Sequence, residues 1–409
     1  VGLNIHRKRG VFLFICLGIV KIFYNAGRVI FVRAYRFRLY PSKCQQALLD
    51  NGRVLAKQLW NSLLEYTKAE YDKTGKFPSS GALYKLTKHS GLYAQVAQNV
   101  ARRLHTALRR IGQMRKLGKC AGFPRFKPVE RVKSLHYPQD GFSILANGTL
   151  KVTPFGAICI RKHREINGRV KGLTLKREPS GKWFAIFTVE EERCVPRINR
   201  GDSIGVDLGL QRFATFSNGA SITNPRFYQH AEVRLAMLQR ALSQCKRGGK
   251  NLAKTKAKLA RAFERVDNMR RDFLHKASRQ LVETYSFVAL EALAPSEMAR
   301  QRFGKSILDA SWAMFANFTC YKAVEAGCTI KFVNPQGTTK TCSACGNQQD
   351  VSLNQRTYCC PRCGLTRDRD VNAAINILAK ATAGTAESHA WGDEAEALSM
   401  SQEASRLNG

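Results

Sequence analysis

Apolar and basic residues alternate along Phe31–Tyr40, a period of two that is typical of a half-buried β-strand. Pro41-Ser42 then ends the strand and offers a helix cap, and a helical spacing of leucine, valine and isoleucine continues over residues 43–117. Short apolar segments predict further strands at Phe142–Leu145, Leu150–Val152, Ala157–Ile160, Leu173–Arg177 and Trp183–Val189. Because Asn147-Gly148 is a strong hairpin signal between two of these segments, we expect a small antiparallel, barrel-like β-domain that holds the helices as an insertion.

The second half of the chain combines short apolar strands with long helices. The expected strands are Ser203–Asp207, Phe213–Ser217, Phe287–Leu290 and Thr329–Val333. The expected helices span about Ala231–Thr284, Ala310–Ala326 and Val371–Ala381. This alternation predicts an α/β domain, so the whole chain is expected to combine α/β and β-barrel architecture.

The charge balance points to a polyanionic partner. The 409 residues include 67 Lys and Arg against 30 Asp and Glu, a net charge of +37, and this basicity is spread over most of the chain. An anionic membrane surface would also attract such a protein, and a basic helix face is often merely solvated, but the wide distribution favours nucleic acid. The basic residues that we expect to contact nucleic acid are Arg36, Arg38, Arg102, Arg103, Arg125, Lys127, Lys254, Lys258 and Arg271.

Both ends of the chain are expected to lie outside the folded core. The apolar run Val11–Val20 resembles a signal peptide, but ten residues are too short to span a bilayer as a helix. We therefore interpret Val1–Ile30 as a translated upstream extension. The tail Thr382–Gly409, rich in Ala, Ser and Glu, is expected to be disordered and acidic. No other segment is long and apolar enough for a membrane span, which favours a soluble protein.

Two closely spaced cysteine pairs predict a zinc ribbon. Cys342-x-x-Cys345 and Cys360-x-x-Cys363 are separated by 14 residues, and each pair can present two thiolates from one tight turn. Four protein ligands leave no open position, so the zinc is expected to be structural. An iron–sulfur or redox role is the alternative, and Cys359 is a competing thiol that would break the symmetric spacing.

Three acids stand at the ends of apolar elements. Asp207 ends one expected strand, Glu291 follows another, and Asp370 directly precedes the last helix. Carboxylates that converge in this way can hold two Mg²⁺ ions for phosphodiester cleavage. Asp207 could instead serve a turn, Glu291 could pair with an arginine, and Asp370 could cap its helix. Asp368 competes with Asp370, and spacing alone does not decide between them. The chain has neither a phosphate-binding loop nor a recognisable Ser/His/Asp or Cys/His set.

Five short motifs occur in order along the chain. They are Tyr35–Pro41, Gly122–Lys127, Gly205–Gly209, the two cysteine pairs with the glycine that follows each, and Asp368–Ile377. In this order they resemble the motifs of TnpB, the OrfB-type protein of insertion sequences, which is similar to the nucleases of type V CRISPR systems. The resemblance covers about residues 32–378.

The resemblance implies a RuvC-like, RNase H-type nuclease domain interrupted by the zinc ribbon and preceded by a split wedge β-barrel that holds a helical recognition domain. The implied ranges are 1–30 for the extension, 31–41 and 122–199 for the wedge, 42–121 for recognition, 200–340 and 367–381 for the nuclease, 341–366 for the ribbon and 382–409 for the tail. It assigns the catalytic triad to Asp207, Glu291 and Asp370. For the third acid it favours Asp370 over Asp368, because the family's acid stands directly before the x-Asn-Ala-Ala motif, here Val371–Ala374.

The resemblance also implies what the protein does. A member of this family would use an RNA from the transposon end to guide Mg²⁺-dependent cleavage of double-stranded DNA, and would support maintenance of the transposon. We expect a monomer without membrane partners in the prokaryotic cytoplasm, associated with the nucleoid when bound to DNA. A nucleic-acid-binding regulator that no longer cuts and a strand-transferring transposase are the alternatives.

Overall fold

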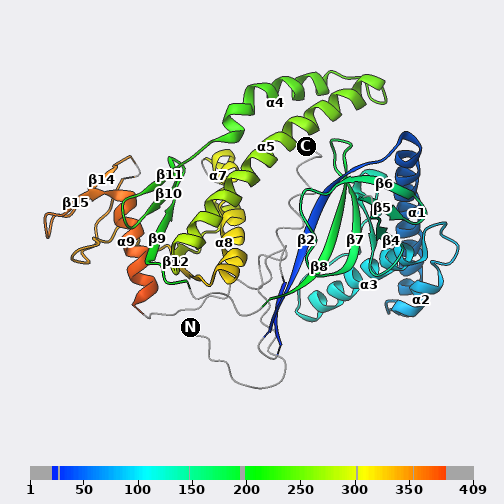
Figure 1. Ribbon diagram of the computed structural model, residues 1–409, viewed down its shortest axis with the longest axis horizontal. Helices are drawn as coiled ribbons and strands as arrows, with labels where there is room; N and C mark the ends of the chain where they lie inside the picture. Colours follow the sequence, from blue (N-terminus) through cyan, green and yellow to red (C-terminus); the bar gives the residue numbers. More distant parts are fainter. Residues whose placement is uncertain are drawn as a thin grey trace. The chain divides into compact units, whose positions relative to one another are not determined.

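The computed structural model describes residues 21–25, 28–146, 148–193, 199–300, 303–352 and 354–383 (Figure 1). The chain divides into two compact units between Arg193 and Cys194. Residues 1–20 of the expected extension and the tail from residue 384 lie outside the described residues, whereas Lys21–Asn25 forms a strand. None of the helices in the described ranges has an apolar stretch that could cross a bilayer.

The first unit is built on an antiparallel sheet of eight strands. These are β1 (Lys21–Asn25), β2 (Arg28–Tyr40), β3 (Ser134–Tyr137), β4 (Phe142–Ile144), β5 (Thr149–Val152), β6 (Gly156–Arg161), β7 (Arg169–Arg177) and β8 (Trp183–Arg193). The order is β3-β7-β8-β2-β6-β5-β4, with β1 on β2. Only four residues separate the edge strands β3 and β4, and the ring centroids of Tyr137 and Phe142 lie 6.5 Å apart across this gap. The sheet is therefore a nearly closed barrel.

Alternation along β2 sets the barrel core. Tyr35, Phe37 and Leu39 are buried, and the intervening residues face outward. The chain leaves β2 through Ser42, whose side chain and that of Gln45 form a capping box that starts α1 (Lys43–Thr74). Helices α2 (Ser80–Lys85) and α3 (Ala94–Lys116) and the short η1 (Val129–Arg131) complete the excursion before β3. The predicted helical insertion is therefore present, and the sequence pattern missed β1, which lies in the expected extension, and the four-residue β3.

The second unit contains a mixed five-stranded sheet (Figure 1). Its strands are β9 (Ser203–Leu208), β10 (Arg212–Phe216), β11 (Ser221–Thr223), β12 (Phe287–Glu291) and β13 (Thr329–Val333), in the order β11-β10-β9-β12-β13. Strands β9, β12 and β13 are parallel, and β10 is antiparallel to β9 and to β11. The helices are α4 (Phe227–Ser243), α5 (Lys250–Thr284), α6 (Pro295–Met298), α7 (Gly304–Ala310), α8 (Trp312–Ala326) and α9 (Arg369–Thr382).

The two faces of this sheet are covered by different helices. Ile204, Val206 and Leu208 on β9 share one apolar core with residues of α5 and α8. Ala289 on β12 belongs instead to a core with α9. Because side chains alternate along a strand, Gly205 and Asp207 lie on the α9 face of β9.

A small ribbon connects β13 to α9. It contains β14 (Thr357–Cys359) and β15 (Thr366–Asp368), which pair antiparallel, and the side chain of Tyr358 is fully buried against cysteines. The ribbon is therefore an insertion directly before the helix that carries Asp370.

Candidate carboxylate and cysteine sites

Four cysteine sulfurs are grouped in the ribbon. The Sγ atoms of Cys342, Cys345, Cys360 and Cys363 all lie within 4.8 Å of one another, and the Cys342–Cys363 and Cys345–Cys360 separations are 3.7 and 3.6 Å. Four thiolates on a tetrahedral zinc at about 2.3 Å would be about 3.8 Å apart, whereas disulfide sulfurs are about 2 Å apart. The donor set and spacing fit a structural zinc with no open position.

The turns that present the sulfurs require glycine. Gly346 and Gly364 each have φ of 73° and donate a backbone N–H to the carbonyl of the first cysteine of their pair, at 3.0 Å. Cys359, the competing thiol of the sequence pattern, is exposed and lies outside the cluster, with its sulfur 3.9 Å from the hydroxyl of Thr366.

Asp207 and Glu291 lie side by side at the carboxyl ends of two parallel strands. Val206 on β9 is the register partner of Leu290 on β12, so the acids that follow them point to the same face. That face is the one that α9 covers. A Cβ on Gly205 would lie 2.0 Å from the backbone oxygen of Ala374, so glycine is what allows α9 to lie directly on β9.

Asp370 lies in the first turn of α9, one helical turn before the residue that contacts Gly205. The N-cap of the helix is Asp368, whose Oδ1 accepts from the N–H groups of Asp370 and Val371 at 2.9 and 3.3 Å. Asp368 also binds Arg212 at 2.9 Å. Burial opposes its ionisation, but these hydrogen bonds outweigh it and lower the pKa of Asp368. Asp368, and not Asp370, is therefore the residue that caps α9.

The electrostatics of the site favour a cation. Desolvation first, and then repulsion by Glu291 and Asp370, raise the pKa of Asp207 to about 8. Desolvation also raises the pKa of Glu291. The guanidinium of Arg369 contacts Asp370 at 3.2 Å and partly offsets the negative charge. Among the described residues, the oxygens of the three carboxylates do not all lie within 4.8 Å of one another, as the four cysteine sulfurs do. Partly buried carboxylate oxygens, whose negative charge the neighbouring Arg369 offsets only in part, are a donor set that fits Mg²⁺.

Several polar residues near the carboxylates were not identified from the sequence. Thr338 is buried and donates its hydroxyl to Oε1 of Glu291 at 2.6 Å. Asn372 and Asn376 are buried on α9 and bind backbone groups of the segment before the ribbon. Two asparagines four residues apart on the otherwise apolar face of a helix were the available signal.

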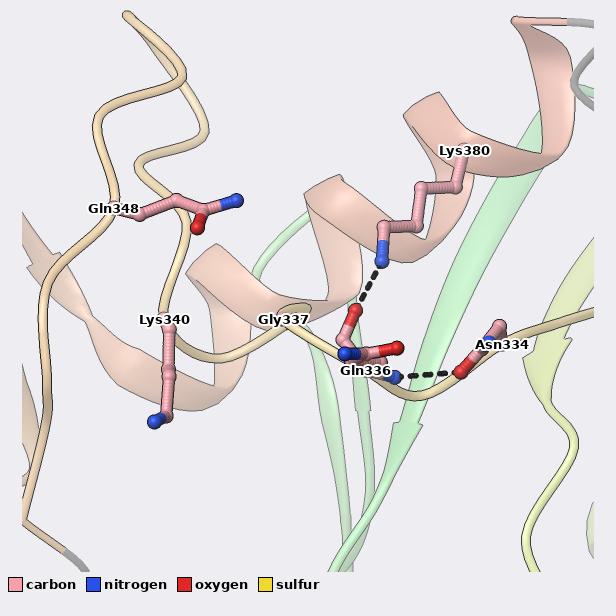
Figure 2. A pocket seen from close by; sticks show the side chains of 6 residues that line it. All are labelled: Asn334, Gln336, Gly337, Lys340, Gln348 and Lys380. Atoms are coloured by element: carbon pink, nitrogen blue, oxygen red, sulfur yellow. Dashed lines mark hydrogen bonds between the residues drawn. The ribbon is translucent and has the colours of Figure 1, made fainter.

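A pocket of about 490 Å³ borders this segment. It is lined by Asn334, Gln336, Gly337, Lys340, Gln348 and Lys380 (Figure 2). Figure 2 shows Lys380 reaching from α9 to the carbonyl of Gln336, at 2.5 Å, and the N–H of Gln336 bound to the side chain of Asn334 at 2.9 Å. Lys340 is paired with Asp350 at 2.6 Å. Of these three contacts, only the one made by Lys380 fastens the loop to α9.

Part of the predicted nucleic-acid surface is a basic cluster in the first unit. Arg102 and Arg103 are exposed on α3, and Arg125 is exposed before β3. The Nζ of Lys127 lies 3.0 Å from the ring centroid of Trp60. Burial, and then repulsion by Arg103, lower the pKa of Lys127 to about 8. Positive charge is thus in excess at this place, and a phosphate would relieve it.

Two other predicted contacts are engaged within the barrel. The guanidinium of Arg36 binds Glu178 at 3.1 Å, and its Cζ lies 3.7 Å from the ring centroid of Phe184. Arg38 donates to the carbonyl of Trp183 at 2.9 Å. These contacts favour a structural use of both arginines on the outer face of the sheet.

The remaining predicted contacts lie on α5. Lys254 and Lys258 are exposed and four residues apart, so they share one side of the helix. Arg271 is half-buried and paired with Asp267 at 2.8 Å. The two lysines are therefore more available to a phosphate backbone than Arg271.

Three sequence-family models match the chain. Residues 32–76 match a "Helix-turn-helix domain" of the OrfB/IS605 type, residues 186–302 match a "Probable transposase" of the same type, and residues 312–377 match a "Cas12f1-like, TNB domain". Together they define a class of insertion-sequence and Cas12f1-like proteins and include the segments that carry Asp207, Glu291, Asp370 and the four cysteines.

Whole-length relatives agree. The chain is 30% identical over 371 residues to a Streptomyces pristinaespiralis protein named "Putative RNA-guided DNA endonuclease", covering 87% of this chain and 90% of that protein. It is 26% identical over 370 residues to the Escherichia coli K12 protein "Putative RNA-guided DNA endonuclease InsQ", covering 85% and 92%. The chain belongs to the TnpB family. A cryo-EM structure of the Cas12f1-sgRNA-target DNA complex shares its fold, with a TM-score of 0.56 and 16% identity over 82% of this chain and 83% of that one.

Proposed function

We propose that this chain is an RNA-guided DNA endonuclease of an insertion sequence, with a catalytic Mg²⁺ site formed by Asp207, Glu291 and Asp370. The observation that carries the proposal is the arrangement of the three acids: Asp207 and Glu291 stand where two parallel strands end beneath α9, Asp370 stands in the first turn of α9, and burial opposes the ionisation of Asp207 and Glu291. The names of the two whole-length relatives support the activity and its RNA and DNA partners.

We further propose that the second unit is a RuvC-like, RNase H-type nuclease domain and that the first unit is the wedge barrel with its recognition helices. The mixed sheet with parallel β9, β12 and β13 supports the first assignment, and the split antiparallel barrel supports the second.

The chain's own residues would act by position and charge. Asp207 and Glu291 present oxygen ligands from neighbouring strands, and Asp370 presents a third from α9. Two Mg²⁺ ions bound there would stabilise the attacking water and the leaving oxygen of the phosphodiester. Exposed basic residues such as Arg103 and Lys254 would hold the nucleic-acid backbone. The closed cysteine site would hold zinc for structure only.

The test is cleavage by protein purified with RNA from its transposon end. Wild type should cut matched duplex DNA in Mg²⁺, and Asp207→Asn should bind the same RNA and DNA without cutting. Cutting by Asp207→Asn at the wild-type rate would refute the assignment. Tight binding by the wild type without any products would instead identify a regulator, and joined products would identify strand transfer.

A further inference from the structure

The segment between β13 and the ribbon makes contact with one of the proposed metal ligands. The hydroxyl of Thr338 lies 2.6 Å from Oε1 of Glu291 and 2.9 Å from the carbonyl of Pro335. Thr338 is 2% exposed, so water does not compete for its single proton. A glutamate side chain has three rotatable bonds, and a short hydrogen bond from a buried hydroxyl restricts them.

The same segment is fastened to α9, which carries Asp370. The side-chain amide of Asn376 donates to the carbonyls of Thr338 and Thr341 at 2.9 and 2.6 Å. One turn earlier, Asn372 donates to the carbonyl of Thr341 at 2.8 Å and accepts from the N–H of Ser343 at 2.9 Å.

These contacts join three parts of the unit. Ser343 directly follows the zinc-binding Cys342, and Asn372 is two residues after Asp370. One turn after Asn376, Lys380 binds the carbonyl of Gln336 (Figure 2). Three successive turns of α9 therefore hold residues 336–343. Asn372 is fully buried and Asn376 is 7% exposed. Loss of the Asn376 amide would remove this donor from the carbonyl of Thr338, and loss of the Asn372 amide would remove the acceptor of the N–H of Ser343.

We propose that Thr338 is a positioning residue for Glu291, and that Asn376 fixes Thr338 relative to α9. Residues 336–343, held to α9 in this way and called the latch below, then set the separation of Glu291 and Asp370. The inference rests on the proposed function, because it takes these acids to be metal ligands. The ribbon then contributes to cation binding at a distance, by anchoring the end of the latch at Ser343.

The test is titration of the full-length protein with Mn²⁺, a paramagnetic substitute for Mg²⁺, followed by electron paramagnetic resonance. Thr338→Val keeps the shape of the side chain and removes its donor, and we expect about a tenfold loss of Mn²⁺ affinity, the low end for partners of metal ligands. Thr338→Ser should restore most of the affinity. In cleavage, Thr338→Val should raise the Mg²⁺ concentration for half-maximal rate more than it lowers the rate at saturation.

A matched control separates positioning from local stability. Thr341→Val removes a hydroxyl that binds the carbonyl of Gly337 at 2.8 Å in the same segment. Among the described residues this hydroxyl is bound to no carboxylate, so Mn²⁺ affinity should be unchanged. Equal losses in Thr338→Val and Thr341→Val, or no loss in Thr338→Val, would overturn the proposal.

The α9 side of the latch is tested separately. Asn376→Leu should weaken Mn²⁺ binding although the amide of Asn376 binds backbone carbonyls and, in the part of the chain that the structure describes, no carboxylate; one zinc per chain should be retained. If that variant does not fold, the smaller change Asn376→Ser serves instead, and wild-type affinity in the folded variant would refute this part. Failure of the proposed function would look different: the wild type would bind no Mn²⁺, or would bind it no more tightly than Asp207→Asn does.

Discussion

Replacement of Asp207 by asparagine should stabilise the metal-free protein while abolishing cleavage. The carboxyl of Asp207 is largely buried beside two other acids, and its pKa is raised from 3.8 to about 8. Asparagine has nearly the same shape and carries no charge. The substitution therefore removes an unfavourable ionisation without creating a cavity.

The magnitude follows from proton linkage. The folded state keeps the proton of Asp207 between pH 4 and 8, where the unfolded chain releases it, so the free energy of unfolding falls as pH rises through this window and levels off above pH 8. At about 1.36 kcal/mol per pH unit, this raised pKa lowers the free energy of unfolding at pH 7 by at most about 4 kcal/mol relative to low pH. Asp207→Asn should recover a few kcal/mol of this, and at about 2–4 °C per kcal/mol its melting temperature should rise measurably.

The assay is differential scanning calorimetry of wild type and Asp207→Asn at pH 5 to 8 with a chelator. The advantage of the variant should grow with pH. Mg²⁺ at about 100 times its dissociation constant should stabilise the wild type by about 2.7 kcal/mol and leave the variant unchanged. The control is Asp202→Asn, an exposed aspartate directly before the same strand, which should have little effect. A variant that is less stable than wild type at pH 8, or a difference independent of pH, would refute the reasoning.

Three further substitutions test other parts of the molecule. Cys345→Ser should lose the zinc measured by elemental analysis, whereas Cys359→Ser should retain it, and equal zinc loss in both would be inconsistent with the four-sulfur cluster. Gly205→Ala should destabilise the second unit by several kcal/mol in thermal melts, because its Cβ would lie 2.0 Å from a backbone oxygen of α9, while Gly112→Ala on α3 has open space and should be neutral or slightly stabilising. Lys127→Gln should weaken RNA binding in titrations at several salt concentrations, and should reduce the slope of log affinity against log salt concentration by about one. An unchanged slope would remove Lys127 from the phosphate contacts.

Local patterns were sufficient for much of the fold. The alternation on Phe31–Tyr40 predicted β2 because one face of that strand is buried against the barrel core and the other is not. The grouping of the cysteines could be predicted as well, because ligand spacing within a knuckle is a local property. β3 was missed because four residues, of which only Leu135 and Tyr137 are buried, are too few for a periodic signal.

The surroundings of the acids could be predicted only in part. Strand ends that meet at one sheet edge explain why Asp207 and Glu291 lie together, and their catalytic role stays a prediction. The resemblance, and not the spacing, favoured Asp370 over Asp368, because a cap and a ligand two residues apart look alike in sequence. The path of the chain shows that Asp368 caps α9, and the role of Asp370 stays a prediction. Thr338 was missed since its contact with Glu291 spans 47 positions and depends on how the loop folds onto α9.

The most direct test of the proposed function is retargeting. The protein would be produced with its transposon-end RNA carrying either of two guide sequences and incubated in Mg²⁺ with DNA matching each guide, and the cut ends would be sequenced. We expect cleavage to follow the guide, cutting only the matched DNA, and to disappear in Asp207→Asn. Cleavage at the same place with either guide, or none with the wild type, would contradict an RNA-guided endonuclease.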